Sequence, residues 1–423
     1  MIGNLKNIVI DNLKNTVLFK KDQPSQNNTT GGELINNNTV FFSRLKVVLI
    51  YTFLFLVCLF FVCYPRFATG KTFIWIGDTY YQHLKTVIYM SKRLPEILKG
   101  MILNKNFTVP LWDMSIGEGA DVINTFAYYG IADPFNLPAL FLHSKFIYIY
   151  FHIATFLRVY FCGLAFMLMY RTINAQDENS DNVIIILCSL LYAFCSWNLF
   201  NLGRHQFFIT PLIYTPLIIT GIEKILRNEK TYFVTIGVFL IGITNLYFLY
   251  SVAVLVFVYS LVRVFVIHNN DFNKACLYLF KIFIQAFVGL LLGACIILPT
   301  AYFFLVDPRR GYKGIIDLLY PIEYYKNLIK IMFIPDLSGN YYWTIMGFGI
   351  LFFIAIAALF IKKNRISEKI LLGITTLFIS IPIFGYIFNT FSYVTNRWSC
   401  LIALLAYYIV CRSMHDIYIY IYI

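Results

Sequence analysis

Long runs of apolar residues recur along this chain, and short polar segments separate them. Several runs approach or meet the roughly 20 helical residues needed to cross a bilayer core of about 30 Å. The longest runs are 47–62, 147–170, 183–200, 277–298, 345–361 and 370–388. This pattern predicts an all-α, polytopic membrane protein.

Three further segments complete the predicted set. Residues 207–223 and 398–411 are two more spans, and residues 232–266 indicate a tight helical hairpin that turns near Asn245. The total is about ten transmembrane helices, with both ends of the chain on the cytoplasmic side. No internal repeat stands out.

Composition excludes a soluble protein. Hydrophobic residues make up 59% of the chain and charged residues 13%, against about 25% charged residues in soluble proteins. The net charge of +13 invites comparison with nucleic-acid-binding proteins, but the basic residues stand at the ends of apolar runs. That distribution is typical of membrane topology and attraction to anionic lipids, so we expect membrane lipids and no nucleic acid as partners.

Basic residues that flank the spans orient the chain. Residues 1–43 are polar and predict a disordered cytoplasmic tail, and residues 44–411 form the transmembrane domain. Its two large outer loops cover about 65–145 and 299–344, and residues 412–423 form a short cytoplasmic tail. The protein is therefore expected to be a multi-pass protein of the cell membrane.

The first outer loop carries an acid that topology does not require. Asp78 follows the first span, within the run Trp75–His83, and an apparently amphipathic helix continues to about Lys99. A carboxylate at this position can act as a general base toward an acceptor hydroxyl. Asp before a helical pattern is also a common N-cap, and the residues alone leave both roles open.

Other polar and aromatic residues of this loop have similar alternatives. Trp112 can stack on a sugar ring or serve as an ordinary interfacial residue. Asp133 precedes a proline, which favours a turn. The glycines at 117 and 119 match no phosphate-binding fingerprint.

Several cations are expected near the outer membrane surface: Arg158, Arg204, Arg309, Arg310 and Arg397. Arg158 falls within a span, where an unpaired charge costs at least a few kcal/mol, so it needs a polar cavity or a partner. Arginine suits a phosphate through its planar set of donors. The alternative is an Arg–Asp pair that joins two helices.

Several short pieces, taken in order, resemble the YfhO family of bacterial membrane proteins, within the GT-C class of glycosyltransferases. The resemblance covers about residues 44–411 and rests on pieces 77–82, Trp112-Asp113 with Gly117 and Gly119, 133–135, 196–198, Arg204-His205, 245–248 and 388–398.

This resemblance implies a GT-C-like fold and a transferase at the outer face of the membrane. The donor would be a polyprenyl-phosphate-linked sugar, the acceptor a cell-envelope polymer such as lipoteichoic acid, and the reaction would invert the anomeric centre. Asp78 is the position to which the catalytic acid of the class carries over. The expected substrate-binding residues are His83, Trp112, Asp113, Asp133, Arg158, Arg204, His205 and Arg397. Some members of the class use a divalent metal ion, and the sequence shows no clear ligand set for one.

The chain also departs from the family. Members are commonly longer, and the repetitive ending 417–423 is typical of a truncation or a frame change, with a natural short form as the alternative. Two rival functions follow: a transporter or flippase for lipid-linked sugars, and an inactive membrane scaffold in envelope assembly. Transporters often carry paired inverted repeats, which this sequence does not show.

Overall fold

The computed structural model describes residues 30–105, 111–175, 181–268, 271–306, 316–334 and 342–422, with side chains from residue 44 to 418. Arg309 and Arg310 lie outside these ranges. The chain forms two compact units, residues 1–49 and 50–423, which are described separately. In the first unit the described residues belong to α2 (Thr30–Ala68), which starts within the stretch predicted to be disordered and continues into the second unit.

Helices dominate the described residues, which confirms the predicted all-α membrane fold. Between the first and second spans lie η1 (Thr79–His83), α3 (Leu84–Leu103), β1 (Trp112–Asp113), β2 (Ala120–Asp121), α4 (Val122–Phe126), η2 (Leu137–Phe141) and η3 (Ser144–Phe146). The central helices are α5 (Ile147–Ile173), α6 (Asn182–Ala193), α7 (Ser196–Asn201), η4 (Gln206–Ile209), α8 (Pro211–Leu226), α9 (Phe233–Thr244), α10 (Leu246–Ile267), α11 (Phe272–Leu292) and α12 (Ala294–Val306). The last group is α13 (Ile322–Phe333), α14 (Ile350–Ile361), α15 (Ile366–Ser380), α16 (Pro382–Phe388), η6 (Arg397–Ser399) and α17 (Cys400–Tyr422).

Fewer helices than expected are long enough to cross a bilayer alone. Seven segments of the described residues qualify, and α15 with α16 makes an eighth if the pair is one span. The predicted straight span over 370–388 is wrong, because the two helices meet at 96°. Pro382 at the first position of α16 explains the bend, since proline disfavours helix at the preceding residue.

The predicted boundary at Asn245 is confirmed. α9 ends at Thr244, α10 begins at Leu246, and the Asn245 side chain accepts a hydrogen bond from the Phe248 amide. The predicted span over 277–298 instead breaks at Gly293, where α11 ends and α12 begins. α12 thus extends to Val306, into the region predicted as an outer loop.

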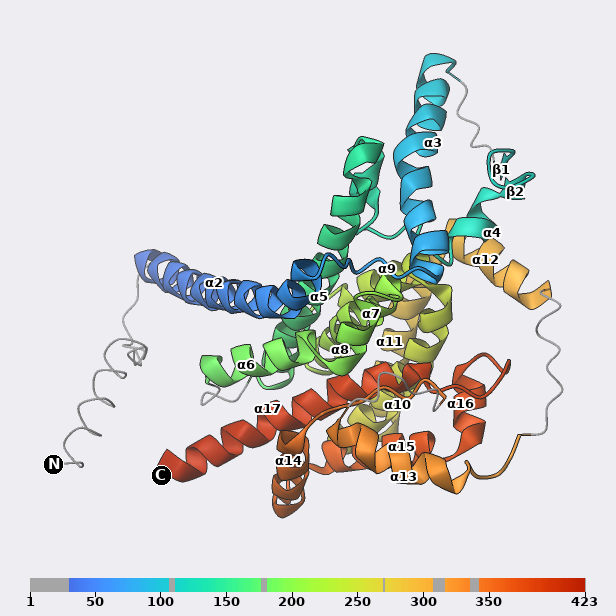
Figure 1. Ribbon diagram of the computed structural model, residues 1–423. Coiled ribbons are helices and arrows are strands. Elements are labelled where there is room, and N and C mark those ends of the chain that lie inside the picture. Colours follow the sequence, from blue (N-terminus) through green and yellow to red (C-terminus); the bar gives the residue numbers. More distant parts are fainter. Residues whose placement is uncertain are drawn as a thin grey trace. The chain divides into compact units, whose positions relative to one another are not determined.

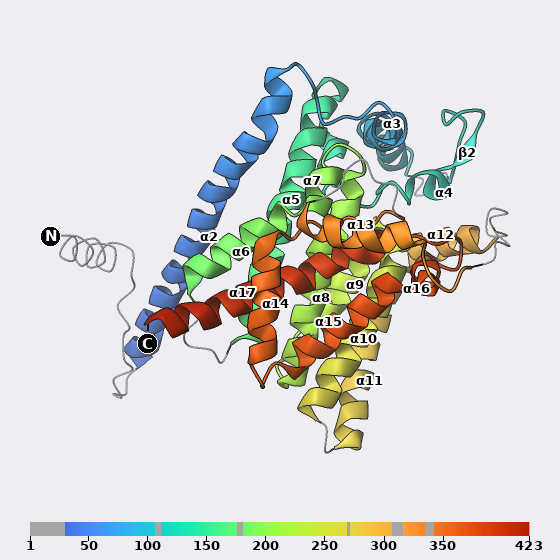
Figure 2. The same cartoon turned by 60° about the horizontal axis from the view of Figure 1, so that its bottom comes forward.

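Close packing of the central helices depends on small residues. A Cβ atom added at Gly237 of α9 would lie 2.5 Å from Ile218 of α8, and one at Gly289 of α11 would lie 2.6 Å from the Thr235 carbonyl. Helices that associate in a membrane gain mainly from such close approach. α9 and α11 run side by side in both views (Figure 1 and Figure 2).

Candidate functional site

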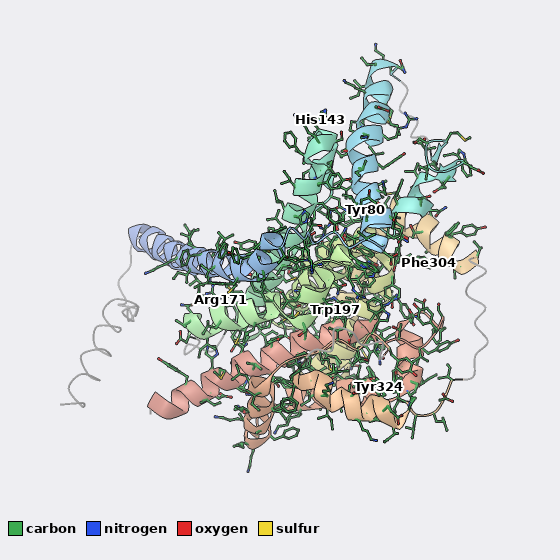
Figure 3. All side chains as sticks on the ribbon, in the orientation of Figure 1. Tyr80, His143, Arg171, Trp197, Phe304 and Tyr324 are labelled. Atoms are coloured by element: carbon green, nitrogen blue, oxygen red, sulfur yellow. The ribbon has the colours of Figure 1, made fainter. Side chains whose placement is uncertain are left out.

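A cavity of about 1140 Å³ lies among α8, α9, α10, α11 and α12. It exceeds the usual range of about 300–1,000 Å³ for small-molecule sites. Most of its wall is apolar, including Phe304 of α12, whose side chain Figure 3 labels. One end is polar and is formed by α4, the residues after it, and the segment between α16 and α17. That end contains Asn124, Thr125, Tyr128, Tyr129, Asn389, Thr390, Ser392, Tyr393 and Arg397.

Arg397 is the charged group of this cavity. Among the described residues that line the cavity, no other side chain carries a formal charge. Its guanidinium carbon lies 4.9 Å from the centre of the Trp343 ring and 5.8 Å from those of Phe208 and Tyr247. Its Nε atom is buried without a hydrogen-bond partner among the described residues, and none of their carboxylates forms an ion pair with it. An arginine that pairs with no carboxylate of the described residues is suited to bind an anion.

Asp78 lies next to His205, which belongs to a different part of the chain. Two contacts bring them together: Thr79 Oγ1 donates to the carbonyl oxygens of Gly203 and Arg204, and the Trp75 amide donates to the Gly203 carbonyl at 3.3 Å. Asp78 Oδ2 then lies 4.0 Å from His205 Nε2. Asp78 occupies the N-cap position of η1, but its side chain makes no capping hydrogen bond, and it is 47% exposed. The carboxylate is therefore accessible for chemistry.

His83 and His205 form a hydrogen-bonded pair. His83 Nε2 lies 3.0 Å from His205 Nδ1. Burial lowers the pKa of His205 to about 4, with help from Arg397 and Arg204. Burial also lowers the pKa of His83, and His205 and Arg158 add to that effect. Both imidazoles are consequently neutral near pH 7.

Tyr128 lies in the cavity lining, where its pKa responds to both Asp78 and Arg397. It lines the polar end, where desolvation raises its pKa to about 12. The nearby Arg397 guanidinium opposes that rise, while the Asp78 carboxylate adds to it. Asp78 and Arg397 thus act electrostatically on the same cavity-lining hydroxyl.

Arg158 and Asp133, both predicted to bind substrate, form an ion pair with each other. Arg158 Nη2 lies 2.8 Å from Asp133 Oδ2 and 2.9 Å from Asn136 Oδ1, and both members of the ion pair are at most 1% exposed. The pair joins α5 to the turn before η2. This arrangement is the Arg–Asp alternative that the sequence left open.

The Asp113 carboxylate is likewise bound by other groups of the protein. It accepts hydrogen bonds from the Tyr89 hydroxyl, Arg93 Nε and the Ser115 amide. Burial alone would raise the pKa of Asp113, but these donors together hold it well below its usual value. The contacts attach β1 to α3, whereas the neighbouring Trp112 is 61% exposed.

Arg204, the neighbour of His205 in the chain, packs on two aromatic rings. Its guanidinium carbon is 4.6 Å from the Phe200 ring centre and 5.2 Å from that of Trp75. Cation–π contacts of this kind hold an arginine in place while leaving its N–H donors available.

Sequence reasoning missed several residues at this site. Tyr247 and the segment 389–393 belong to pieces that carried the family resemblance, but no role was assigned to them. Trp343 belongs to none of those pieces. Its backbone and that of Tyr342 adopt positive φ angles of 59° and 53°, a strained conformation that often marks functional sites.

No group of three or more His, Cys, Asp or Glu side chains within the described residues is arranged to hold a metal ion.

The family model described as "Bacterial membrane protein YfhO" matches residues 50–420. A Bacillus subtilis (strain 168) protein described as "Uncharacterized protein YfhO" is 25% identical over 210 residues, which is 47% of this chain and 22% of that protein. The chain therefore matches less than a quarter of this relative's length. No solved structure matches.

Proposed function

This chain belongs to the YfhO family of bacterial membrane proteins, and from that premise we propose that it is a membrane glycosyltransferase. It would transfer a sugar from a polyprenyl-phosphate donor to a hydroxyl of a cell-envelope polymer, such as lipoteichoic acid, at the outer face of the membrane. The predicted topology, in which the first large loop lies outside, supports that location.

One observation carries the proposal: among the described residues that line a large apolar cavity, Arg397 at the polar end is the one charged group. The described lining thus suits an amphiphile with a long apolar tail and one anionic head. A polyprenyl phosphate has this form. Hydroxyl and amide groups beside Arg397, from Asn389 to Tyr393 and from Tyr128, supply further hydrogen-bonding groups for the phosphate or the sugar.

The chemistry follows from the two ends of this arrangement. Asp78 takes the proton from the acceptor hydroxyl as its oxygen attacks the anomeric carbon. The bond between that carbon and the phosphate oxygen breaks, its electron pair remains on the phosphate, and Arg397 stabilises the added charge. Direct displacement inverts the anomeric centre. The proton leaves Asp78 to solvent, because the side chain is half-exposed.

Arg204 is proposed to act on the acceptor side. It is not part of the described lining of the cavity, and its guanidinium packs on the rings of Phe200 and of Trp75, which stands three residues before Asp78. Trp112 is exposed and keeps the sugar-stacking role that its residue type suggests.

The test compares envelope-polymer glycosylation in a deletion strain that carries the wild-type chain, Asp78→Asn or Asp121→Asn. Asp121 is the matched control, since its side chain caps α4 by accepting from the Asn124 amide and asparagine can do the same. With equal amounts of each protein in the membrane, we expect the wild type and Asp121→Asn to restore glycosylation and Asp78→Asn to fail. Full restoration by Asp78→Asn would overturn the mechanism.

A second measurement separates the rival functions. Purified protein in vesicles receives a labelled polyprenyl-phosphate sugar and a polymer acceptor. Release of polyprenyl phosphate supports the transferase. Movement of the intact lipid between leaflets, without release, would indicate a transporter, and neither activity would indicate a scaffold.

A further inference from the structure

The proposed reaction uses Asp78 but gives no role to His205, which lies next to Asp78, or to His83, which contacts His205. We infer that His83 and His205 form a neutral, tautomer-locked pair that directs the Nε2–H group of His205 at the Asp78 carboxylate. His205 is then the positioning residue of the base, and His83 determines which nitrogen of His205 carries the proton. This inference rests on the proposed function of Asp78.

The surroundings of His83 select its tautomer. Its ring is 1% exposed and packs against Phe207 and Tyr129, with ring centres 4.7 and 5.3 Å away. Its Nδ1 atom is buried and has no hydrogen-bond partner among the described residues. A buried N–H without an acceptor is rarer in proteins than an unsatisfied acceptor. The proton therefore resides on Nε2, which faces His205.

The tautomer of His83 determines the tautomer of His205. If His83 Nε2–H donates across the 3.0 Å contact, His205 Nδ1 is the acceptor and carries no proton. The proton of neutral His205 is then on Nε2, the atom 4.0 Å from Asp78 Oδ2. This separation is longer than a hydrogen bond, and hydrogen bonds of catalytic groups commonly shorten when substrate closes the site.

Burial, and then the nearby cations, favour the neutral form of both imidazoles. Burial is the larger cause for each, Arg397 and Arg204 add to it at His205, and Arg158 adds to it at His83. Asp78 is the acid that faces His205, at ion-pair distance. A neutral N–H donor holds the carboxylate in one orientation without forming a permanent imidazolium–carboxylate pair.

Rings around His205 keep it in place. It stacks on Phe208 at 4.7 Å between ring centres, and the Trp343 ring centre is 5.9 Å away. Replacement by phenylalanine keeps a flat ring and removes the N–H donor. Replacement by glutamine keeps an N–H donor near the position of Nε2. The two variants separate the donor from the packing.

The first arm of the experiment requires no enzymatic activity. The full chain, labelled with ¹⁵N at its six histidines, is purified in detergent, and the tautomer of each imidazole is read by NMR at pH 7. His205→Gln and His83→Phe assign the two signals. We expect Nε2–H tautomers for both residues and loss of the single tautomer of His205 in His83→Phe. A proton on Nδ1 of His205, or an imidazolium at pH 7, would overturn the inference.

The second arm measures kcat and KM for the wild type, His205→Phe and His205→Gln. Loss of the N–H donor to the Asp78 carboxylate should lower kcat about tenfold in His205→Phe, with little change in KM. His205→Gln should restore kcat. If both variants lose kcat to the same extent, His205 is only a packing residue. Full activity of Asp78→Asn would instead reject the proposed function, while the NMR arm would still test the histidine pair.

Discussion

Arg158 Nη2 and Asp133 Oδ2 are 2.8 Å apart, and both side chains are almost fully buried. The pair joins a membrane-spanning helix to the polar segment that precedes it. Removing one partner of a buried pair leaves the other charged and unpaired, which typically costs about 3–5 kcal/mol.

Arg158→Met should therefore lower the stability of the protein by about 3–5 kcal/mol, as measured by thermal or denaturant unfolding in detergent. The double variant Arg158→Met with Asp133→Leu should recover part of the loss, since no unpaired charge remains. Unchanged stability together with weaker donor binding would instead support the substrate-binding role predicted from sequence.

Arg397→Gln should weaken binding of a polyprenyl phosphate at least about tenfold, because the cavity loses the cation at its polar end. Arg397→Lys should bind with intermediate affinity, since lysine keeps the charge but not the planar set of donors. Binding of radiolabelled lipid to the purified protein measures both. The control is Lys274→Gln, a change at an exposed residue outside the described lining. An equal loss in this control would show that net charge alone governs binding.

Ala286→Phe should reduce lipid binding by filling part of the apolar cavity. The matched control is Leu291→Phe on the same helix, because Leu291 is 57% exposed and is not part of the described lining. The same radiolabelled-lipid assay compares the two, after gel filtration confirms that both proteins are folded. If both bind like the wild type, the tail lies elsewhere.

Stability should fall as the pH falls from about 7 to 5. The pKa of His205 is lowered to about 4 in the folded chain, against about 6.5 when it is unfolded, so the unfolded state binds more protons between these values. The stabilisation is complete above about pH 6.5 and is lost toward pH 4. His205 alone accounts for about 2 kcal/mol between pH 7 and 5.

The pH dependence of the unfolding midpoint checks this expectation. His205→Gln should flatten the curve over this range, whereas His143→Gln, a change at a residue whose ring lies near the surface, should not. A curve that is as steep in His205→Gln as in the wild type would assign the effect to other groups. Burial lowers the pKa of His83 in the same direction, so His83 would then be the group that titrates over this range.

At Asp78 the sequence left open a question that the fold answers. Its two possible roles, base or cap, were equal from sequence because both depend on local position. The structure shows that its side chain makes no cap and lies beside His205. Trp343 shows the opposite case: nothing near it in sequence indicates that its ring meets Arg397, since that contact depends on strained backbone in a separate segment.

The sequence by itself determined the membrane class, the helical character and most of the span positions. These depend on local composition, because a segment within the bilayer needs apolar side chains and must satisfy its backbone hydrogen bonds internally. Only the tertiary structure decided which polar residues meet. His83 and His205 are 122 positions apart, and contacts over such distances depend on how the helices pack. The same packing made Arg158 and Asp133 a buried pair and left Arg397 without a carboxylate among the described residues.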